Sequence, residues 1–209
     1  MAGIAFAAVA LATTGAASGS APTAQTGKMC TVAAETGAER CFDTISEALE
    51  SITGVPITDP AVDAGDHAAF NRAVEHGNAV VLANRKAALA GPSLDSDTSL
   101  TATRSAVAAA SSDVTLGAVW KDRDWKGYGK VFYGVTGSGC YATTYGFPHT
   151  RDYGYNDNIS SITSYNNCAT TLYKDSSYGG TSRTYQGDTA YVGDTMNDET
   201  SSIVYRPRS

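Results

Sequence analysis

The sequence has little positive charge and no basic cluster. Its 209 residues carry 15 Lys and Arg against 21 Asp and Glu, which gives a net charge of −6. The excess of acid lies in residues 1–114, where six basic residues face 12 acidic ones, while residues 115–209 hold nine of each. A surface that captures nucleic acid needs a concentration of Lys and Arg to contact the phosphates. We therefore expect no nucleic-acid partner.

The sequence also lacks an apolar run long enough to cross a membrane, which takes about 20 residues. The N-terminal stretch "MAGIAFAAVALATTGAASGSA" is apolar and then rich in small residues. This pattern is typical of a secretory signal peptide, although no Lys or Arg precedes the apolar run. We assign residues 1–27 to a signal peptide and short spacer, with cleavage near Ala17, and predict a secreted, extracellular protein without a membrane anchor. An Ala-rich low-complexity N-terminus is the alternative.

No two cysteines have the C-x-x-C spacing that is typical of zinc ribbons and redox motifs. Four cysteines permit three disulfide pairings. Because each half of the chain holds two, the economical pairing joins Cys30 to Cys41 and Cys140 to Cys168. The alternative is a catalytic Cys140 assisted by His149. Two disulfides would account for all four cysteines without it.

Aromatic side chains are almost absent from the first half of the chain. All 12 Tyr and both Trp follow residue 115, and before it only Phe6, Phe42 and Phe70 occur. Residues 28–78 therefore predict a small α+β segment with few large apolar side chains, which would be only marginally stable by itself. Residues 79–114 are rich in Ala, Ser and Thr and predict a linker that can hold a short helix near Ala79–Leu89.

Residues 28–78 predict a hairpin followed by helices. Cys30-Thr-Val has strand character, Thr36-Gly37 is typical of a turn, and Glu39–Phe42 returns as the second strand. We next predict a helix that Asp43 caps and Gly54 ends. Its apolar residues recur at helical spacing: Ile45, Ala48, Leu49 and Ile52. Residues 60–77 predict a second helix.

The second half of the chain contains an internal repeat. "WKDRDWKGYGKVFYG" begins at Trp120 and "YKDSSYGGTSRTYQG" at Tyr173, and they match at a constant offset of 53 residues. The phrase Asn-Asp-x-x-Ser-Ser-Ile begins at Asn156 and again at Asn197, at an offset of 41 residues. Both repeats thus share both ends in the same order. The difference between the offsets means that the first repeat holds 12 extra residues, which include Cys140.

Each repeat predicts four short strands separated by Gly turns, with the Asn-Asp phrase as the loop before the last strand. Four such strands suggest a Greek key, and two Greek keys would pack as a β-sandwich of roughly 90 residues. We therefore predict an all-β domain over residues 115–209, with repeats at about 116–166 and 168–207.

The segment Leu116–Pro207 resembles the βγ-crystallin domains, which are sandwiches of two Greek keys. The resemblance rests on the aromatic and Gly positions of the first hairpin of each repeat: Trp120, Gly127, Phe132 and Gly134, with Tyr173, Gly180, Tyr185 and Gly187. It rests also on "NDNISS" and "NDETSS", which match the calcium motif N/D-N/D-x-x-S/T-S of microbial members. "NNCATTLYKDSSYGG" is similar to the related Streptomyces metalloproteinase-inhibitor family of secreted peptidase inhibitors. The segment "MCTVAAETGAERCFDTISEAL", residues 29–49, resembles a leader segment of such secreted proteins more weakly.

The resemblance implies two calcium ions as the cofactor. The phrases offer only oxygen donors, which calcium prefers. The implied metal residues are Asn156, Asp157, Asn158, Ser160, Asn197, Asp198, Glu199 and Ser201. In the family the loops cross, so one ion would take the Asn158 carbonyl, the Ser160 hydroxyl and the Asp198 carboxylate. The other ion would take the corresponding groups of Glu199, Ser201 and Asp157. A plain turn is the alternative for such phrases, because Asn, Asp and Ser bond their own backbone, but their repetition favours calcium.

No nucleophile with a base, phosphate loop or catalytic zinc motif is visible, so we predict no enzyme. We predict a secreted, monomeric βγ-crystallin-like protein that binds calcium, which stabilises it. The alternative is a secreted peptidase inhibitor that acts on an extracellular protease through the insertion at residues 135–155. Its candidate inhibitory residues are Cys140, Tyr141 and Tyr145. A small secreted toxin ranks last.

Overall fold

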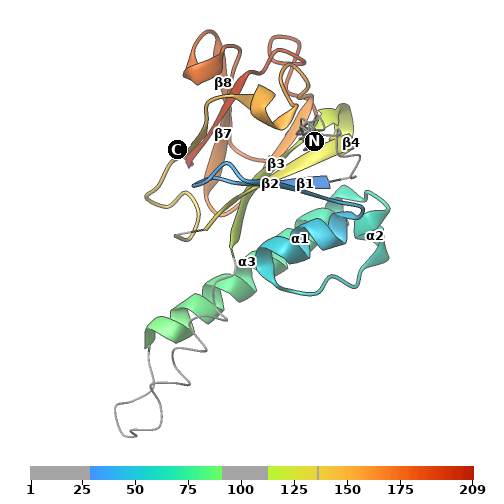
Figure 1. The fold of residues 1–209 in the computed structure, drawn as a ribbon, viewed down its shortest axis with the longest axis vertical. Helices are drawn as coiled ribbons and strands as arrows, with labels where there is room; N and C mark the ends of the chain where they lie inside the picture. The colour runs from blue at the N-terminus through green and yellow to red at the C-terminus, as the bar shows by residue number, and fades with distance from the viewer. Residues whose placement is uncertain (1–28, 91–112, 136) are drawn as a thin grey trace, which may run out of the picture.

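The computed structural model describes residues 29–90, 113–135 and 137–209, and every statement below concerns these residues. It contains two β-sheets and a layer of helices that covers the outer face of one sheet (Figure 1). The predicted signal peptide lies outside the described residues, as does most of the predicted linker. No helix within the described ranges is both long and apolar enough to cross a membrane.

The first sheet has five strands in the order β2-β1-β4-β3-β6. Strand β1 pairs parallel with β4, and the other neighbours pair antiparallel. The strands are β1 Met29–Ala33, β2 Glu39–Phe42, β3 Val114–Asp122, β4 Lys126–Gly134 and β6 Ser161–Ser164. The predicted N-terminal hairpin is therefore present, and it also extends the sheet of the first repeat.

The second sheet has four antiparallel strands in the order β5-β9-β7-β8. The strands are β5 Tyr145–Phe147, β7 Cys168–Tyr173, β8 Ser182–Tyr185 and β9 Ser202–Pro207. Three short 3-10 helices connect strands of the C-terminal half of the chain: η1 Arg123–Trp125, η2 Thr150–Tyr153 and η3 Ser176–Tyr178. The prediction that the C-terminal half is built of β-sheets is confirmed.

The two repeats exchange segments between the sheets. Strand β5 belongs to the first repeat but pairs with β9 of the second. In return, Thr189 of the second repeat forms a bridge to Ile162 in β6 of the first. Each repeat therefore contributes to both sheets, and neither can complete its sheet alone.

Both predicted disulfides are present. Cys30 and Cys41 lie opposite each other on β1 and β2, with their Cα atoms 4.0 Å apart. Cys140 is joined to Cys168, with the Cα atoms 4.8 Å apart. No free cysteine is left in the described residues, so the alternative of a catalytic Cys140 is wrong.

Helix α1 spans Ile45–Thr53, and its N-cap is Thr44 rather than the predicted Asp43. The Thr44 side chain accepts a hydrogen bond from the Glu47 N–H, and the Glu47 carboxylate accepts one from the Thr44 N–H. This reciprocal capping box satisfies two backbone donors at once, which a cap at the preceding residue would not do. Gly54 ends the helix in the left-handed conformation, with φ of 68°, as predicted.

The region after α1 holds helix α2, Pro60–Asp63, and helix α3, His67–Ala90. The predicted single helix over 60–77 is wrong, because Gly65 adopts φ of 80° and breaks it. Asp66 then starts α3, since its carboxylate accepts from the Ala69 N–H. The short helix predicted near Ala79–Leu89 is the continuation of α3, which Asn78 fixes to β3 through two hydrogen bonds with the Thr115 backbone.

The first sheet is the middle layer of three. Along β3, Leu116 and Val119 face the second sheet, whereas Ala118 and Trp120 pack against the helices. Strands β1 and β3 are buried along almost their whole length. The helices need few large apolar side chains of their own because they cover apolar groups that the strands already present.

A buried ion pair ties the N-terminal hairpin to β4. The Lys130 ammonium contacts the Glu39 carboxylate, and only 2% of the Lys130 side chain is exposed. The rings of Tyr128 and Tyr155 each lie 5.2 Å from the Lys130 nitrogen. Burial lowers the pKa of Lys130, and the hydrogen bond to Glu39 acts against that change. The lysine therefore depends on Glu39 to keep its charge in a poorly solvated place.

We predict that Glu39→Ala lowers the free energy of unfolding by about 3–5 kcal/mol, because it leaves the buried Lys130 ammonium without a partner. Adding Lys130→Met to this variant should restore much of the lost stability, since no charge then remains buried. Urea unfolding of the single and double variants measures both effects. Arg72→Ala, which breaks an exposed pair with Asp59, is the control and should cost less than about 1 kcal/mol. Equal losses in Glu39→Ala and the double variant would contradict the assignment.

Candidate metal centre

The two Asn-Asp-x-x-Ser-Ser segments lie against each other through a reciprocal pair of backbone hydrogen bonds. The Asp157 N–H donates to the Thr200 carbonyl over 3.0 Å, and the Asp198 N–H donates to the Ile159 carbonyl over 3.2 Å. The donor occupies the same position of the phrase in both loops, and so does the acceptor. The loops are thus related by an approximate twofold axis, although they lie 41 residues apart in the sequence.

The aspartate of each loop has a left-handed backbone. Its φ is 52° at Asp157 and 55° at Asp198. Asn and Asp adopt this conformation more readily than other residues with a side chain. The preceding asparagine then donates a side-chain hydrogen bond to the aspartate, over 2.6 Å from Asn156 and 2.7 Å from Asn197. The Asn-Asp pair therefore orients an exposed carboxylate in each loop.

The residues after each Asn-Asp pair anchor the loop in the core. The Ile159 and Thr200 side chains are fully buried, and Ser160 and Ser201 are 5% and 9% exposed. Ser160 receives a backbone hydrogen bond from Val192, and its own N–H donates to the Trp120 carbonyl. The backbone of each serine is consequently anchored next to the exposed part of its loop.

One carboxylate meets the hydroxyl of the opposite loop. The Ser201 hydroxyl donates to Asp157 Oδ1 over 3.4 Å. These two residues come from different repeats, as the crossed arrangement requires. Glu199 lies at the exposed edge, where its carboxylate is 3.4 Å from the Lys174 ammonium. That carboxylate is therefore directed to a surface ion pair, which leaves the backbone carbonyl as the group that Glu199 can offer.

The last serine of each phrase connects the loop to the neighbouring hairpin. The Ser161 hydroxyl donates to the Asp122 carbonyl and accepts from the Trp125 N–H. The Ser202 hydroxyl does the same with the Asp175 carbonyl and the Tyr178 N–H.

These bonds hold two consecutive left-handed residues in each hairpin: Asp124 and Trp125 in the first, Ser177 and Tyr178 in the second. These left-handed pairs were not predicted from the sequence, although the constant offset of 53 residues between the hairpins was an available signal of their equivalence.

One other group of potential ligands lies close together in the described ranges, namely Cys30, Glu39 and Cys41. The two cysteines form a disulfide, and a metal ion binds the thiolate rather than a disulfide sulfur. This group is therefore structural. The paired loops differ from it, because each carries one aspartate and would need hydroxyl, carbonyl and water oxygens to complete a shell.

The predicted inhibitory residues lie in different environments. Tyr141 is 63% exposed, next to the Cys140–Cys168 disulfide. Cys140 is fully buried, and Tyr145 is 7% exposed in β5, where it pairs with Tyr205 of β9. Of the three, only Tyr141 has a largely exposed side chain. Tyr145 was predicted to belong to the inhibitory loop, but its ring is part of the core between the sheets.

Comparison with known proteins gives structural neighbours of one kind. No family model matches the chain, and no curated protein does. A βγ-crystallin domain from Flavobacterium johnsoniae is similar at 25% identity over 44% of this chain and 94% of its own, with a TM-score of 0.35. One from Clostridium beijerinckii is similar at 18% identity over 44% of this chain and 97% of its own, with a TM-score of 0.36. A double mutant of clostrillin in complex with nickel is similar at 20% identity over 44% of this chain and 97% of its own, with a TM-score of 0.35. The neighbours are thus βγ-crystallin domains, while the relation to metalloproteinase inhibitors stays a prediction.

We predict that Ser161→Ala and Ser202→Ala each lower the free energy of unfolding by about 1–3 kcal/mol. Each change removes a hydroxyl that satisfies one backbone carbonyl and one backbone N–H, and both serines are fully buried. Urea unfolding without added metal measures the losses. Ser182→Ala on the exposed start of β8 is the control, with an expected change within about 0.5 kcal/mol. A loss in Ser161→Ala as small as in this control would show that the hydroxyl is dispensable.

Proposed function

We propose that the protein is a non-catalytic calcium-binding protein with two ions at the paired loops, and that calcium stabilises its β-sandwich. The observation that carries the proposal is the contact between Asp157 and Ser201, which places oxygen donors of both repeats 3.4 Å apart. The reciprocal bonds of Asp157 with Thr200 and of Asp198 with Ile159 support the same arrangement in the other half.

The donor set fits calcium better than a transition metal. Each loop offers carboxylate, hydroxyl and carbonyl oxygens, and the described loops contain no histidine or cysteine. Calcium is a hard cation that takes six to eight oxygens, often including water. Zinc and copper prefer nitrogen and sulfur ligands. A shell with one aspartate and several neutral oxygens therefore favours calcium.

The proposed ligation is crossed. One ion takes the carbonyl of Asn158, the hydroxyl of Ser160 and the carboxylate of Asp198. The other takes the carbonyl of Glu199, the hydroxyl of Ser201 and the carboxylate of Asp157. Asn156 and Asn197 hold the aspartates rather than the ions, because their amides donate to the neighbouring carboxylates.

The affinity should be modest, because each site holds only one carboxylate. We expect dissociation constants of roughly 10⁻⁵ to 10⁻³ M, as in extracellular modules and weak sensors. Calcium at a hundredfold excess over such a constant adds about 2.7 kcal/mol for each site. Domain stabilities are about 5–15 kcal/mol, so this is a large share of the total.

The proposal includes secretion and a fold of two Greek keys. Secretion is supported by the N-terminal apolar stretch and by two disulfides, which persist in oxidising compartments. The Greek-key interpretation is supported by the exchange of β5 and the Thr189 segment between the sheets. We propose further that the protein is a monomer in the extracellular space.

Crossed ligation makes a testable prediction about stoichiometry. Calorimetric titration of the chain should give two calcium ions. Asp157→Ala with Ser201→Ala removes ligands of one site and should leave one ion bound. Asp157→Ala with Ser160→Ala removes a ligand from each site and should abolish binding at millimolar calcium.

The melting temperature with and without calcium provides the second measurement. The calcium-induced rise should be largest in the unaltered chain and absent in Asp157→Ala with Asp198→Ala. Asp194→Ala is the matched control, because Asp194 is an exposed aspartate between the loops that bonds Tyr191 instead. A chain that shows neither heat nor a rise in melting temperature with calcium would refute the proposal. One ion bound in Asp157→Ala with Ser160→Ala, together with none in Asp157→Ala with Ser201→Ala, would refute crossed ligation alone.

Peptidase inhibition is the second candidate function. One observation favours it, namely that Tyr141 is 63% exposed beside the Cys140–Cys168 disulfide. A side chain on a rigid loop loses little conformational freedom on binding, which favours affinity. The partner would be an extracellular protease that accepts an aromatic residue.

If this candidate is right, the chain at micromolar concentration should slow a thermolysin-like metalloprotease, and Tyr141→Ala should weaken that inhibition at least about tenfold, as expected for a central aromatic contact. The extent of inhibition is measured as the residual protease activity against a small chromogenic peptide. Tyr178→Ala, at a partly exposed tyrosine of the second repeat, should inhibit as well as the unaltered chain. Full protease activity at micromolar chain would exclude this enzyme class as the target.

A further inference from the structure

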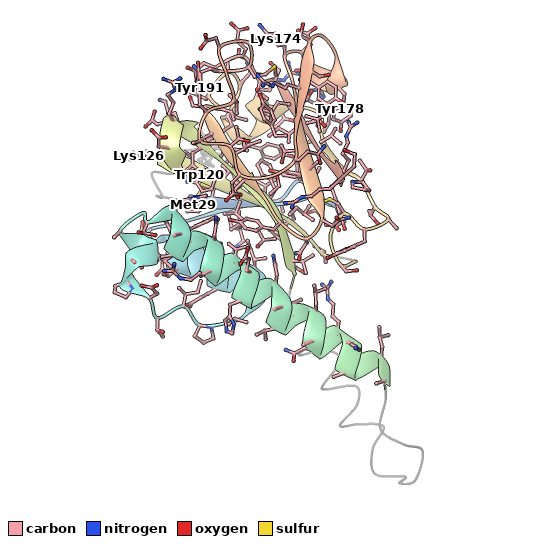
Figure 2. The ribbon with its side chains drawn as sticks, turned by 180° about the vertical axis from the view of Figure 1, so that it is seen from behind. Met29, Trp120, Lys126, Lys174, Tyr178 and Tyr191 are labelled. Atoms are coloured by element: carbon pink, nitrogen blue, oxygen red, sulfur yellow. A yellow bond between two sulfur atoms is a disulfide. The ribbon has the colours of Figure 1, made fainter. Side chains whose placement is uncertain are left out.

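A pocket of about 490 Å³ lies where the helices meet the first repeat. Sites for small organic ligands span about 300–1,000 Å³ and are lined mostly by apolar and aromatic groups with a few polar ones. Its walls come from two parts of the chain that are distant in sequence. The aromatic side of the lining consists of His67, Phe70, Trp120, Trp125 and Tyr128. Figure 2 shows Met29 and Trp120 at this junction.

The floor of the pocket is rigid. Phe70 and Trp120 are 2% and 4% exposed, and their rings meet edge to face with centroids 5.2 Å apart. The Met29 side chain closes on Gly129, where an added Cβ would lie 3.0 Å from the methionine sulfur. The shape of the floor is therefore set by close packing and does not depend on a ligand.

Trp125 forms one wall in an unusual backbone conformation. Its φ is 56°, and its indole N–H donates to the Ile162 carbonyl over 3.0 Å. One face of the indole stacks on the His67 ring, with the centroids 3.5 Å apart and the planes inclined by 5°. Burial lowers the pKa of His67, while Asp188 and Asp66 act against that change. The wall is thus an aromatic stack held by the indole hydrogen bond and by the contact between the two rings.

Among the described residues that line the pocket, Lys126 is the available cation. Lys126 is exposed at its rim and forms no ion pair with any residue that the structure describes. The carboxylate at the opposite rim, Asp63, accepts a hydrogen bond from the Ser46 N–H over 2.8 Å. The aspartate is therefore engaged in the helical layer, while the lysine is free to pair with a ligand.

The equivalent hairpin of the second repeat has different surroundings. Tyr178 occupies the position of Trp125, is 39% exposed, and has the Tyr173 ring as its neighbour, with the centroids 5.9 Å apart. Tyr178 and Lys174 both lie in the part of the molecule away from the helices (Figure 2). The pocket therefore arises from the N-terminal segment and is not part of the calcium arrangement that both repeats share.

We propose that this pocket binds a small, flat, apolar organic anion, with its rings against the Trp120, Trp125 and Tyr128 side chains and its anionic group at the Lys126 ammonium. Flat apolar rings match aromatic walls of fixed orientation, and offset or edge contacts with them are favourable. A carboxylate or sulfonate would gain a charge-assisted hydrogen bond from Lys126. The site is independent of the proposed calcium binding, so either can fail without the other.

The fluorescent anion 8-anilino-1-naphthalenesulfonate tests this directly, because it combines flat rings with one sulfonate. We expect saturable binding of one molecule per chain, with energy transfer from tryptophan to the probe. Lys126→Met should weaken this binding about tenfold, which corresponds to the loss of one charged hydrogen bond. Its neutral analogue N-phenyl-1-naphthylamine should bind both forms equally well, because it lacks the sulfonate.

Two further pairs of variants distinguish binding in the pocket from nonspecific binding. Ala64→Phe should fill the pocket from the helical side and abolish binding of both probes, whereas Ala68→Phe on the exposed face of α3 should leave binding within about twofold. Trp125→Ala should weaken binding about tenfold, whereas the equivalent Tyr178→Ala should not change it. Circular dichroism and the melting temperature establish that each variant is folded.

The proposal is overturned if the probe fails to bind saturably, or if it binds the folded Ala64→Phe variant as tightly as the unaltered chain. It is also overturned if Trp125→Ala and Tyr178→Ala weaken binding equally, because the pocket then plays no special part. Equal weakening of both probes by Lys126→Met would refute the role of the lysine as the partner of an anion.

Discussion

Strand β3 has apolar side chains on both of its faces, and water has to be excluded from each. The second sheet covers one face, where Leu116 and Val119 pack. The helices α1–α3 cover the other, where Ala118 and Trp120 pack. Full burial of a large apolar side chain contributes about 1.5–3 kcal/mol, so neither cover can be removed without a considerable loss. This double burial explains why an N-terminal segment that is poor in aromatic residues is nevertheless well packed. It also explains why β1 adds to the sheet as a parallel neighbour of β4 rather than forming a separate hairpin.

The same packing gives two related hairpins different surroundings. Both hairpins have a pair of left-handed residues held by a buried serine, Ser161 or Ser202. In the first repeat the aromatic residue at the tip, Trp125, lies under α3 and lines a pocket. In the second repeat the corresponding Tyr178 is partly exposed. The paired loops are therefore nearly symmetric, whereas the surfaces around them are not. This difference supports one shared role for the loops in stability and a separate role for the first hairpin.

Much of the fold could be predicted because its signals are local or repeated. The apolar spacing of Ile45, Ala48, Leu49 and Ile52 gave α1, and the left-handed Gly54 ends it. The offset of 53 residues identified equivalent hairpins, and the even division of the cysteines gave both disulfides. The errors arose where a local pattern had two outcomes. Asp43 and Thr44 are both good caps, and only the capping box with Glu47 decides between them. Tyr145 was predicted to belong to the inhibitory loop, but pairing with Tyr205 of the other repeat buries it.

In the candidate metal centre, too, some features follow from the local sequence and others from tertiary contacts. The sequence by itself favoured the left-handed backbone of each aspartate, because an Asn-Asp pair tolerates this conformation and the asparagine amide bonds the adjacent carboxylate. It also determined the kind of donor, since the phrases contain oxygen ligands alone. Only the tertiary structure decided that Asp157 meets Ser201, a residue 44 positions away, and that α3 covers Trp125 but not Tyr178. Those contacts depend on how the sheets and helices pack, because burial of apolar surface is not directional and a local sequence cannot specify which distant group will cover it.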